Sequence, residues 1–235
     1  MTDFDTKKLN KNWTIEDSIS TYGIDKWGEK YFSINSEGNI SISPDKKSKK
    51  KVDLFKLVKE FKSREINTPL IIRFNDILKD RITELNNAFS QAIETYDYKN
   101  IYQGVFPIKC NQQRNVLEKI IEYGDRWNFG LEVGSKSELL IGLSILENQK
   151  SLLICNGYKD KNYIESAILA RKLGKQPIIV IEQRDEVKRI IEAVKNLKAT
   201  PILGIRSKLS SKSSGRWGKS VGDNSKFGLS IPEIM

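Results

Sequence analysis

Side chains that could do chemistry stand at the ends of apolar segments, beginning with Lys109, which directly follows Val105–Ile108. A lysine in a low-dielectric site has a lowered pKa, and its neutral amine can attack a carbonyl carbon, as a Schiff-base lysine must. The alternative is a lysine whose charged end simply reaches solvent from the end of a strand. The residues by themselves leave both interpretations open.

Polar residues also follow later apolar segments, namely Glu132, Cys155-Asn156-Gly157, Glu182 and Arg206. Sites in parallel α/β folds gather at the carboxyl ends of strands, so a barrel would turn Glu132 and Arg206 toward the same mouth as Lys109. Solvated loop charges are the alternative for each. The spacing of the two cysteines forms no metal or redox motif, which favours plain reduced thiols.

The composition of the 235-residue sequence excludes several classes of protein. The absence of His removes serine-triad and Cys-His chemistry and nearly all zinc catalysis, so an enzyme would use Lys, Asp, Glu, Tyr, Cys or Arg, or a cofactor. The net charge is +10, and the one dense run of positive charge, Lys46–Lys51, lies in a predicted loop. Such a run is more often a solvated loop than a site that binds a polyanion. We therefore do not expect nucleic acid as a partner. Without an apolar run of about 18 residues or a secretory signal, we expect no membrane association and a cytoplasmic location.

The elements that must position these residues fall into two predicted regions. In residues 1–65, Tyr31–Ser43 has two alternating runs around a Gly-containing turn and predicts a β-hairpin. Val52–Arg64 has the apolar spacing of an amphipathic helix. Residues 66–235 form the second predicted domain, and its polar stretch Ser213–Gly222 lacks the glycine and the following helix that a phosphate-binding loop needs.

In this second region apolar strands alternate with amphipathic helices, which predicts a parallel sheet covered by helices. The predicted strands cover residues 70–73, 101–108, 129–133, 152–155, 177–182 and 201–206. This even spacing suits a (β/α)₈ barrel, of which about five strands would be present before Met235, because typical barrels need about 250 residues. A complete open sheet is the alternative, and periodicity does not separate the two.

A resemblance to a known family narrows these alternatives. Val105–Gln112 (VFPIKCNQ) resembles the lysine motif of pyridoxal-phosphate decarboxylases with an alanine-racemase-type barrel. A longer ordered set, running from Trp13 to the end, is similar to the bacterial biosynthetic arginine decarboxylases. The set comprises Trp13–Tyr22 (WTIEDSISTY), Tyr31–Ser43, Gly130–Leu139 (GLEVGSKSEL), Ile154–Tyr158 (ICNGY), and Gly204–Arg206 with Ser225–Leu229 (SKFGL).

The resemblance implies conversion of L-arginine to agmatine and CO₂, in arginine catabolism and polyamine (spermidine) biosynthesis. Lys109 would carry pyridoxal 5′-phosphate, whose ring takes up the electrons left by CO₂ loss. Glu132, Ser135 and Glu138 match a stretch near the cofactor, and Arg206 matches an arginine close to the cofactor ring. The resemblance also implies Mg²⁺ dependence, although the sequence shows no magnesium site, and a homo-oligomer in the complete enzyme.

Family members are far longer than this sequence. They continue with a histidine that stacks on the ring, a glycine-rich phosphate loop, a glutamate at the pyridine nitrogen and a C-terminal β-domain. We therefore expect the N-terminal portion of such an enzyme, inactive by itself. The alternative is a non-enzymatic α/β protein that binds a small molecule or a polyanion. A complete short pyridoxal-phosphate-binding barrel fits less well, because residues 1–65 lie outside the barrel.

Overall fold

The computed structural model describes residues 12–208, 225 and 228–235. The chain divides into two compact units, Met1–Arg81 and Ile82–Met235, and each is considered by itself. The polar stretch Ser213–Gly222 lies outside the described residues. Among the helices of the described part, none is long and apolar enough to cross a membrane.

A small antiparallel sheet organises the first unit. It consists of β1 (Phe32–Ile34), β2 (Ile40–Ile42) and β3 (Val52–Asp53), in the order β1-β2-β3. The predicted hairpin is confirmed, with Phe32 opposite Ile42, and Gly38 supplies the positive φ of 79° in its turn. Helices α1 (Ile15–Tyr22), α2 (Ile24–Trp27) and α3 (Leu54–Ser63) complete the unit.

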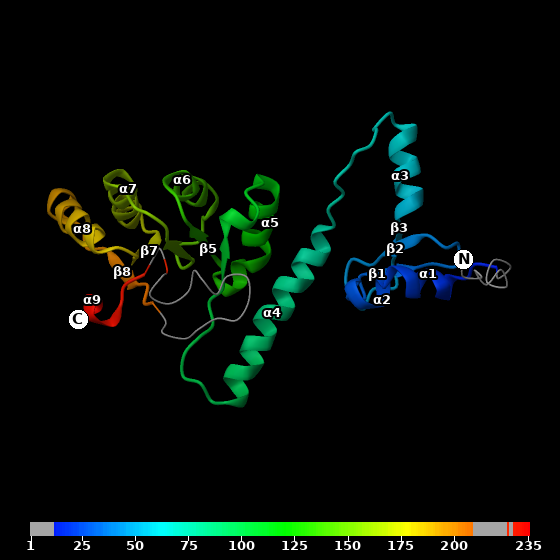
Figure 1. Cartoon of the computed structure of the whole chain (residues 1–235), viewed down its shortest axis with the longest axis horizontal. Helices are drawn as coiled ribbons and strands as arrows, with labels where there is room; N and C mark the ends of the chain where they lie inside the picture. The colour runs from blue at the N-terminus through cyan, green and yellow to red at the C-terminus, as the bar shows by residue number, and fades with distance from the viewer. Residues whose placement is uncertain (1–11, 209–224, 226–227) are drawn as a thin grey trace, which may run out of the picture. The chain divides into compact units, whose positions relative to one another are not determined.

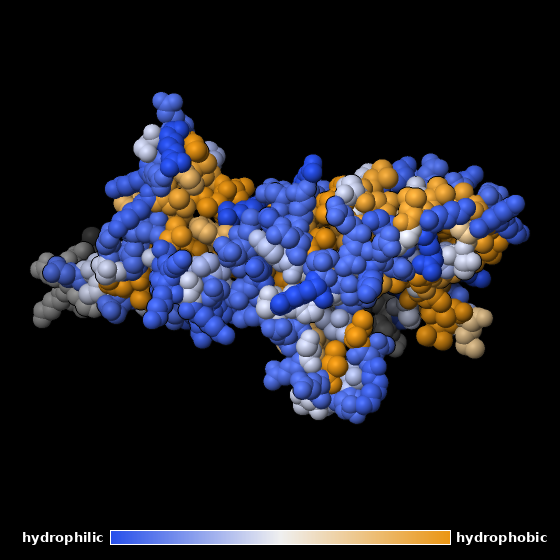
Figure 2. Space-filling view, turned by 180° about the vertical axis from the view of Figure 1, so that it is seen from behind, coloured by the Kyte–Doolittle hydropathy of each residue, from blue (hydrophilic) through white to orange (hydrophobic). Residues whose placement is uncertain are grey.

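Helix α3 begins two residues later than its apolar spacing predicts. Val52 and Asp53 pair with β2, and the Asp53 carboxylate accepts the backbone N–H of Lys56 as the helix N-cap. No residue of α3 is fully buried, and Phe55 is 52% exposed. Figure 2 shows apolar side chains along this helix, so the first unit presents an apolar surface there.

The predicted strand at Leu70–Arg73 is wrong. These residues have no regular secondary structure, and α4 (Asn75–Thr95) starts one residue later, after Phe74. Strand geometry is stable where backbone groups pair with a neighbouring strand and apolar side chains are buried. Leu70–Arg73 pairs with neither described sheet, and Ile71 is 79% exposed.

Five parallel strands form the sheet of the second unit. They are β4 (Val105–Pro107), β5 (Gly130–Val133), β6 (Leu152–Cys155), β7 (Gln176–Ile181) and β8 (Ile202–Ile205). Their spatial order, β4-β5-β6-β7-β8, follows the chain without reversal. A doubly wound sheet reverses its order, whereas a (β/α)₈ barrel does not, so the described part has the arrangement of the predicted incomplete barrel.

Helices connect successive strands and cover one face of this sheet. They are α5 (Arg114–Gly124), α6 (Lys136–Ile145), α7 (Lys161–Lys172) and α8 (Arg184–Leu197), and Figure 1 shows them side by side along the sheet. The short helix α9 (Ile231–Ile234) follows β8. The predicted alternation of strands and helices is therefore confirmed, although β4 is shorter than the expected segment 101–108.

Alternation along each strand separates a core from a second face. One set of strand residues packs against the helices and is buried: Leu131, Val133, Leu153, Cys155 and Ile179. The intervening residues form a row in register on the opposite face: Pro107, Glu132, Ile154, Ile178 and Ile202. Because the strands are parallel, the polar residues at their carboxyl ends meet along one edge of the sheet.

Candidate active site

Lys109 lies in a tight turn directly after β4. The 3₁₀ turn η2 (Ile108–Cys110) ends the strand, and the fully buried Ile108 fixes it to the core. The Lys109 side chain is 64% exposed, and its Nζ lies 3.3 Å from Oε1 of Glu132 on the adjacent strand. The structure thus brings together Lys109 and Glu132, which the sequence predicted to lie at neighbouring strand ends. The Lys109 amine is open to an incoming molecule.

Glu132 is buried on β5, with its side chain 8% exposed. Its Oε1 accepts a second hydrogen bond, 3.0 Å long, from Nδ2 of Asn156 just beyond β6. Its Oε2 is buried and has no hydrogen-bond partner among the described residues. A buried carboxylate oxygen without a donor is costly, so this atom indicates a site that another group completes.

Ser135 and Glu138 fix the start of α6, beside Glu132. The Ser135 Oγ accepts the backbone N–H of Glu138 as the N-cap. The Glu138 carboxylate is buried and accepts from the Gly134 N–H at 2.7 Å and from Nε2 of Gln112 at 3.0 Å. Gln112 belongs to the segment that carries Lys109, so Glu138 links the ends of the first two strands of the sheet.

Close backbone approach also fixes this edge. Gly157, just after β6, has a φ of 78°, and a Cβ added there would lie 2.2 Å from the carbonyl oxygen of Gly134. No side chain fits at that distance, and the left-handed backbone suits glycine. The loops after β5 and β6 therefore touch directly.

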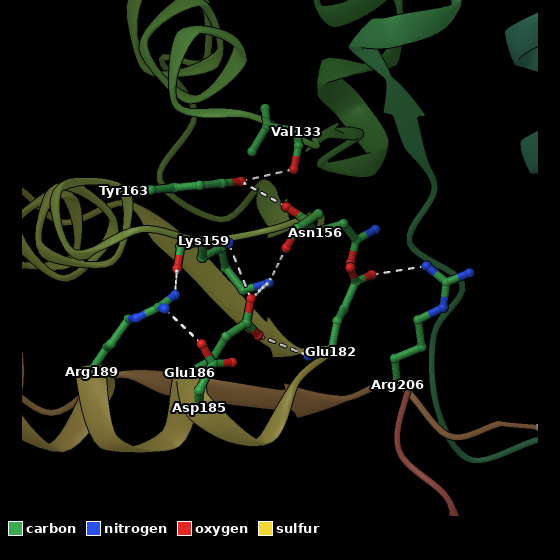
Figure 3. A network of polar contacts seen from close by, with 10 residues as sticks. Val133, Asn156, Lys159, Tyr163, Glu182, Asp185, Glu186, Arg189 and Arg206 are labelled. Atoms are coloured by element: carbon green, nitrogen blue, oxygen red, sulfur yellow. Dashed lines mark hydrogen bonds and ion pairs between the residues drawn. The ribbon is translucent and has the colours of Figure 1, made fainter. Parts of the chain in front are cut away.

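Arg206 lies two strands farther along the edge than Asn156, at the end of β8. Its guanidinium donates to Oε1 of Glu182 at 2.9 Å, as Figure 3 shows. The Glu182 side chain is 1% exposed, whereas that of Arg206 is 51% exposed. Glu182 directly follows β7, so the ends of β7 and β8 join through this ion pair.

Two further charged residues form a buried ion pair beneath this edge, and sequence reasoning missed them. The Nζ of Lys159 lies 3.1 Å from Oε1 of Glu186, and Glu186 Oε2 accepts the backbone N–H of Glu182 (Figure 3). Arg189 of α8 donates to the Lys159 carbonyl. A signal was available for Glu186, which stands in the first turn of a predicted helix where a carboxylate can bind preceding backbone N–H groups. Nothing in the sequence marks Lys159 as buried.

The cysteines are both unpaired, as predicted, and differ in environment. Cys110 is exposed next to Lys109, whereas Cys155 is buried on the helix-covered face of the sheet. Burial raises the pKa of Cys155 to about 12. Burial likewise raises the pKa of Tyr163, whose hydroxyl donates to the carbonyls of Val133 and Asn156. In the described residues no group of three or more His, Cys, Asp or Glu could hold a metal ion.

The arrangement places an exposed amine, a buried carboxylate and a guanidinium at the carboxyl ends of parallel strands. An amine in this setting can condense with an aldehyde, a neighbouring carboxylate can accept or stabilise a proton, and a guanidinium can bind an anionic group. The exposed Lys109 amine can therefore bind a carbonyl compound covalently, with the Glu132 carboxylate beside it.

Comparison with known proteins agrees with this chemistry. Residues 80–234 match the family described as pyridoxal-dependent decarboxylase, pyridoxal binding domain. The biosynthetic arginine decarboxylase of Prochlorococcus marinus subsp. pastoris (strain CCMP1986 / NIES-2087 / MED4) is 95% identical over 235 residues, which are 100% of this chain and 36% of that relative. The chain thus spans about a third of the length of this curated relative.

Two solved structures show similar folds. The biosynthetic arginine decarboxylase SpeA from Campylobacter jejuni superposes with a TM-score of 0.77 at 30% identity, over 91% of this chain and 33% of SpeA. Diaminopimelate decarboxylase from M. jannaschii superposes with a TM-score of 0.60 at 20% identity, over 87% of this chain and 42% of that enzyme, and at this identity the likeness concerns the fold alone. With its match over residues 80–234, the chain belongs to the family of pyridoxal-dependent decarboxylases, and the match lies in their pyridoxal-binding domain.

Proposed function

We propose that the protein carrying this sequence is an arginine decarboxylase that converts L-arginine to agmatine and CO₂ with pyridoxal 5′-phosphate. The observation that carries the proposal is the exposed Lys109 amine 3.3 Å from the buried Glu132 carboxylate, at the edge where the parallel strands end. The 95% identity to a relative named biosynthetic arginine decarboxylase supports arginine as the substrate.

The residues present fit the cofactor. The Lys109 side chain is open to an incoming aldehyde, and the buried Glu132 Oε2 has no hydrogen-bond partner among the described residues. When bound, the cofactor supplies an electron sink for the carbon that loses CO₂. Lys109 would hold it covalently through Nζ, and the Glu132 carboxylate, 3.3 Å from that nitrogen, would lie beside the point of attachment.

The other predicted residues would support this pair. Ser135 and Glu138 would shape the cofactor side of the edge through the start of α6, because both already fix the backbone beside Glu132. Arg206 would bring its guanidinium toward the cofactor from β8, since half of its side chain is exposed. The position of these residues at the carboxyl ends of the strands supports each role, and substitution of each residue can test it.

For the whole protein we infer a place in arginine catabolism and polyamine (spermidine) biosynthesis, a homo-oligomeric assembly and dependence on Mg²⁺, all from the resemblance. The two unpaired cysteines support a cytoplasmic location, where thiols stay reduced. Residues 1–65 would form an accessory segment and 66–235 the first part of the barrel.

The test uses a full-length chimaera in which this sequence replaces the matching segment of the 95%-identical relative. Reduction with borohydride after addition of pyridoxal 5′-phosphate should fix the cofactor on Lys109, mapped by mass spectrometry, and the protein should form agmatine from L-arginine. Lys109→Ala should remove the label and lower kcat about a thousandfold or more. Lys119→Ala, at a partly exposed lysine of α5 that pairs with Glu122, is the matched control. A label on another lysine, or absence of agmatine, would refute the proposal.

A further inference from the structure

Glu182 is a buried carboxylate at the strand edge to which the resemblance assigns no role. One of its oxygens binds Arg206, and the other, Oε2, is buried with no hydrogen-bond partner in the described part of the chain. Removing a carboxylate from water is costly, and an ion pair with the half-exposed Arg206 returns little net stability. The arrangement therefore points to a task other than holding the fold together.

The backbone of Glu182 is fixed on both sides. Its N–H donates to Oε2 of Glu186 at 2.9 Å, and its carbonyl accepts the N–H of Gly228 at 3.0 Å. Glu186 is itself bound to the fully buried Lys159. Because these partners come from the loop after β6, from α8 and from the segment before α9, the Glu182 carboxylate has a defined position.

The backbone of Arg206 is fixed as well, and its side chain is bounded. Its N–H donates to the Ile181 carbonyl at 3.0 Å, and its carbonyl accepts the Leu229 N–H at 2.8 Å. A Cβ added to Gly228 would lie 3.4 Å from the Arg206 Cγ, so Gly228 lies directly against this side chain. Glu182 is the described acidic partner that fixes the end of the guanidinium.

We propose that Glu182 is a positioning residue that orients the Arg206 guanidinium so that its remaining N–H donors face the cofactor. An arginine has five N–H donors in a planar fork, and its free side chain has many rotamers. One buried carboxylate that engages NH1 removes much of that freedom and leaves donors for a ligand, in keeping with the 51% exposure of Arg206. The orientation of Arg206 by Glu182 does not depend on the proposed function, whereas binding of the cofactor by Arg206 rests on it.

The first arm of the test needs no catalysis. Phenylglyoxal adds to the guanidinium nitrogens, so a carboxylate bound to NH1 should slow its reaction with Arg206, which is exposed enough to be reached. In the chimaera without cofactor, Glu182→Leu should speed modification of Arg206 about tenfold, as mapped by mass spectrometry, and Glu182→Gln should give a smaller change. Asp185→Asn is the matched control, because Asp185 pairs with Arg189, and it should leave the rate unchanged.

The second arm measures cofactor binding in a double-mutant cycle. Glu182→Leu and Arg206→Gln should each raise the pyridoxal 5′-phosphate concentration for half-maximal absorbance about tenfold, and the double variant should match Arg206→Gln within about twofold. Independent, multiplicative effects would overturn the proposal, as would an unchanged phenylglyoxal rate in Glu182→Leu.

The two arms separate this proposal from the proposed function. If the parent chimaera binds cofactor on a lysine other than Lys109 while Glu182→Leu speeds modification of Arg206, the proposed function fails and the orientation of Arg206 by Glu182 holds. If Lys109 is labelled and agmatine forms while neither arm responds to Glu182→Leu, the positioning role fails and the function holds. Should Glu182→Leu fail to fold, Glu182→Gln serves both arms with the same directions and smaller changes.

Discussion

The Nζ of Lys159 lies 3.1 Å from Oε1 of Glu186, and neither side chain has any solvent exposure. The ammonium also donates to the Gly157 carbonyl, and the Lys159 backbone N–H donates to the same Glu186 oxygen. This single carboxylate therefore joins the loop after β6 to the first turn of α8, directly below Glu182.

Removing one charge of this pair should be strongly destabilising. Lys159→Met leaves the Glu186 carboxylate buried without its counter-ion, which costs about 3–5 kcal/mol in the free energy of unfolding. Lys159→Met/Glu186→Gln should recover part of this loss, because the buried charge is gone. Lys161→Met, at an exposed lysine whose Nζ lies 3.8 Å from the partly buried Glu165, should cost less than about 1 kcal/mol. Urea unfolding of the chimaera measures all three, and equal losses for the two lysine variants would contradict the prediction.

Gly157→Ala should disrupt the strand edge far more than Gly174→Ala. Both glycines have a φ near 80°, so both substitutions strain the backbone. A Cβ at Gly157 would meet the Gly134 backbone oxygen at 2.2 Å, whereas at Gly174 it would meet the flexible Gln149 side chain at 3.1 Å. We expect a loss of at least about 3 kcal/mol at Gly157 and about 1 kcal/mol at Gly174. Thermal melts of the two variants test this, and similar melting temperatures would show that the loops can separate.

Asn156 should prove necessary for the Lys109–Glu132 pair. Asn156→Leu removes the 3.0 Å hydrogen bond to Glu132 Oε1 while keeping the side-chain size. Leaving a buried carboxylate one donor short costs about 1–3 kcal/mol, and we expect the cofactor concentration for half-maximal borohydride labelling to rise about tenfold. Asn148→Leu, at an amide that binds Asp125 instead, should leave labelling unchanged. An unaltered labelling curve for Asn156→Leu would show that Glu132 needs no second donor.

The two cysteines should differ sharply toward alkylation. At pH 8, N-ethylmaleimide should modify the exposed Cys110 quickly and the buried Cys155 only after denaturant is added, as peptide mapping of the chimaera can show.

Burial raises the pKa of Cys155 from 9.0 to about 12, so the folded state holds this proton more tightly than the unfolded state does. The resulting stability is fully present below pH 9.0 and is lost as the pH rises toward about 12. Cys155→Ala should flatten the pH dependence of the free energy of unfolding between pH 9.0 and about 12. Rapid alkylation of Cys155 in the folded protein would contradict its burial.

The sheet and its helices could be predicted because apolar periodicity depends on local sequence. The proximity of Lys109 and Glu132 was also predictable, since neighbouring parallel strands end at one edge. Leu70–Arg73 has the apolar character of a strand but finds no described partner, and pairing is a tertiary property. The Lys159–Glu186 pair could not be foreseen, because a lysine and a glutamate 27 positions apart look like two solvated charges until the fold buries them. The link from Glu182 to Arg206 was hidden for the same reason.

The order of the strands along the sheet has a consequence for how the chain is made. Because β4 to β8 lie in the order in which they are synthesised, each new strand finds its partner already formed as it leaves the ribosome. Each step closes only one strand-helix unit, so the entropy lost per step stays small. Assembly of this sheet can thus proceed in the direction of translation, one unit after another.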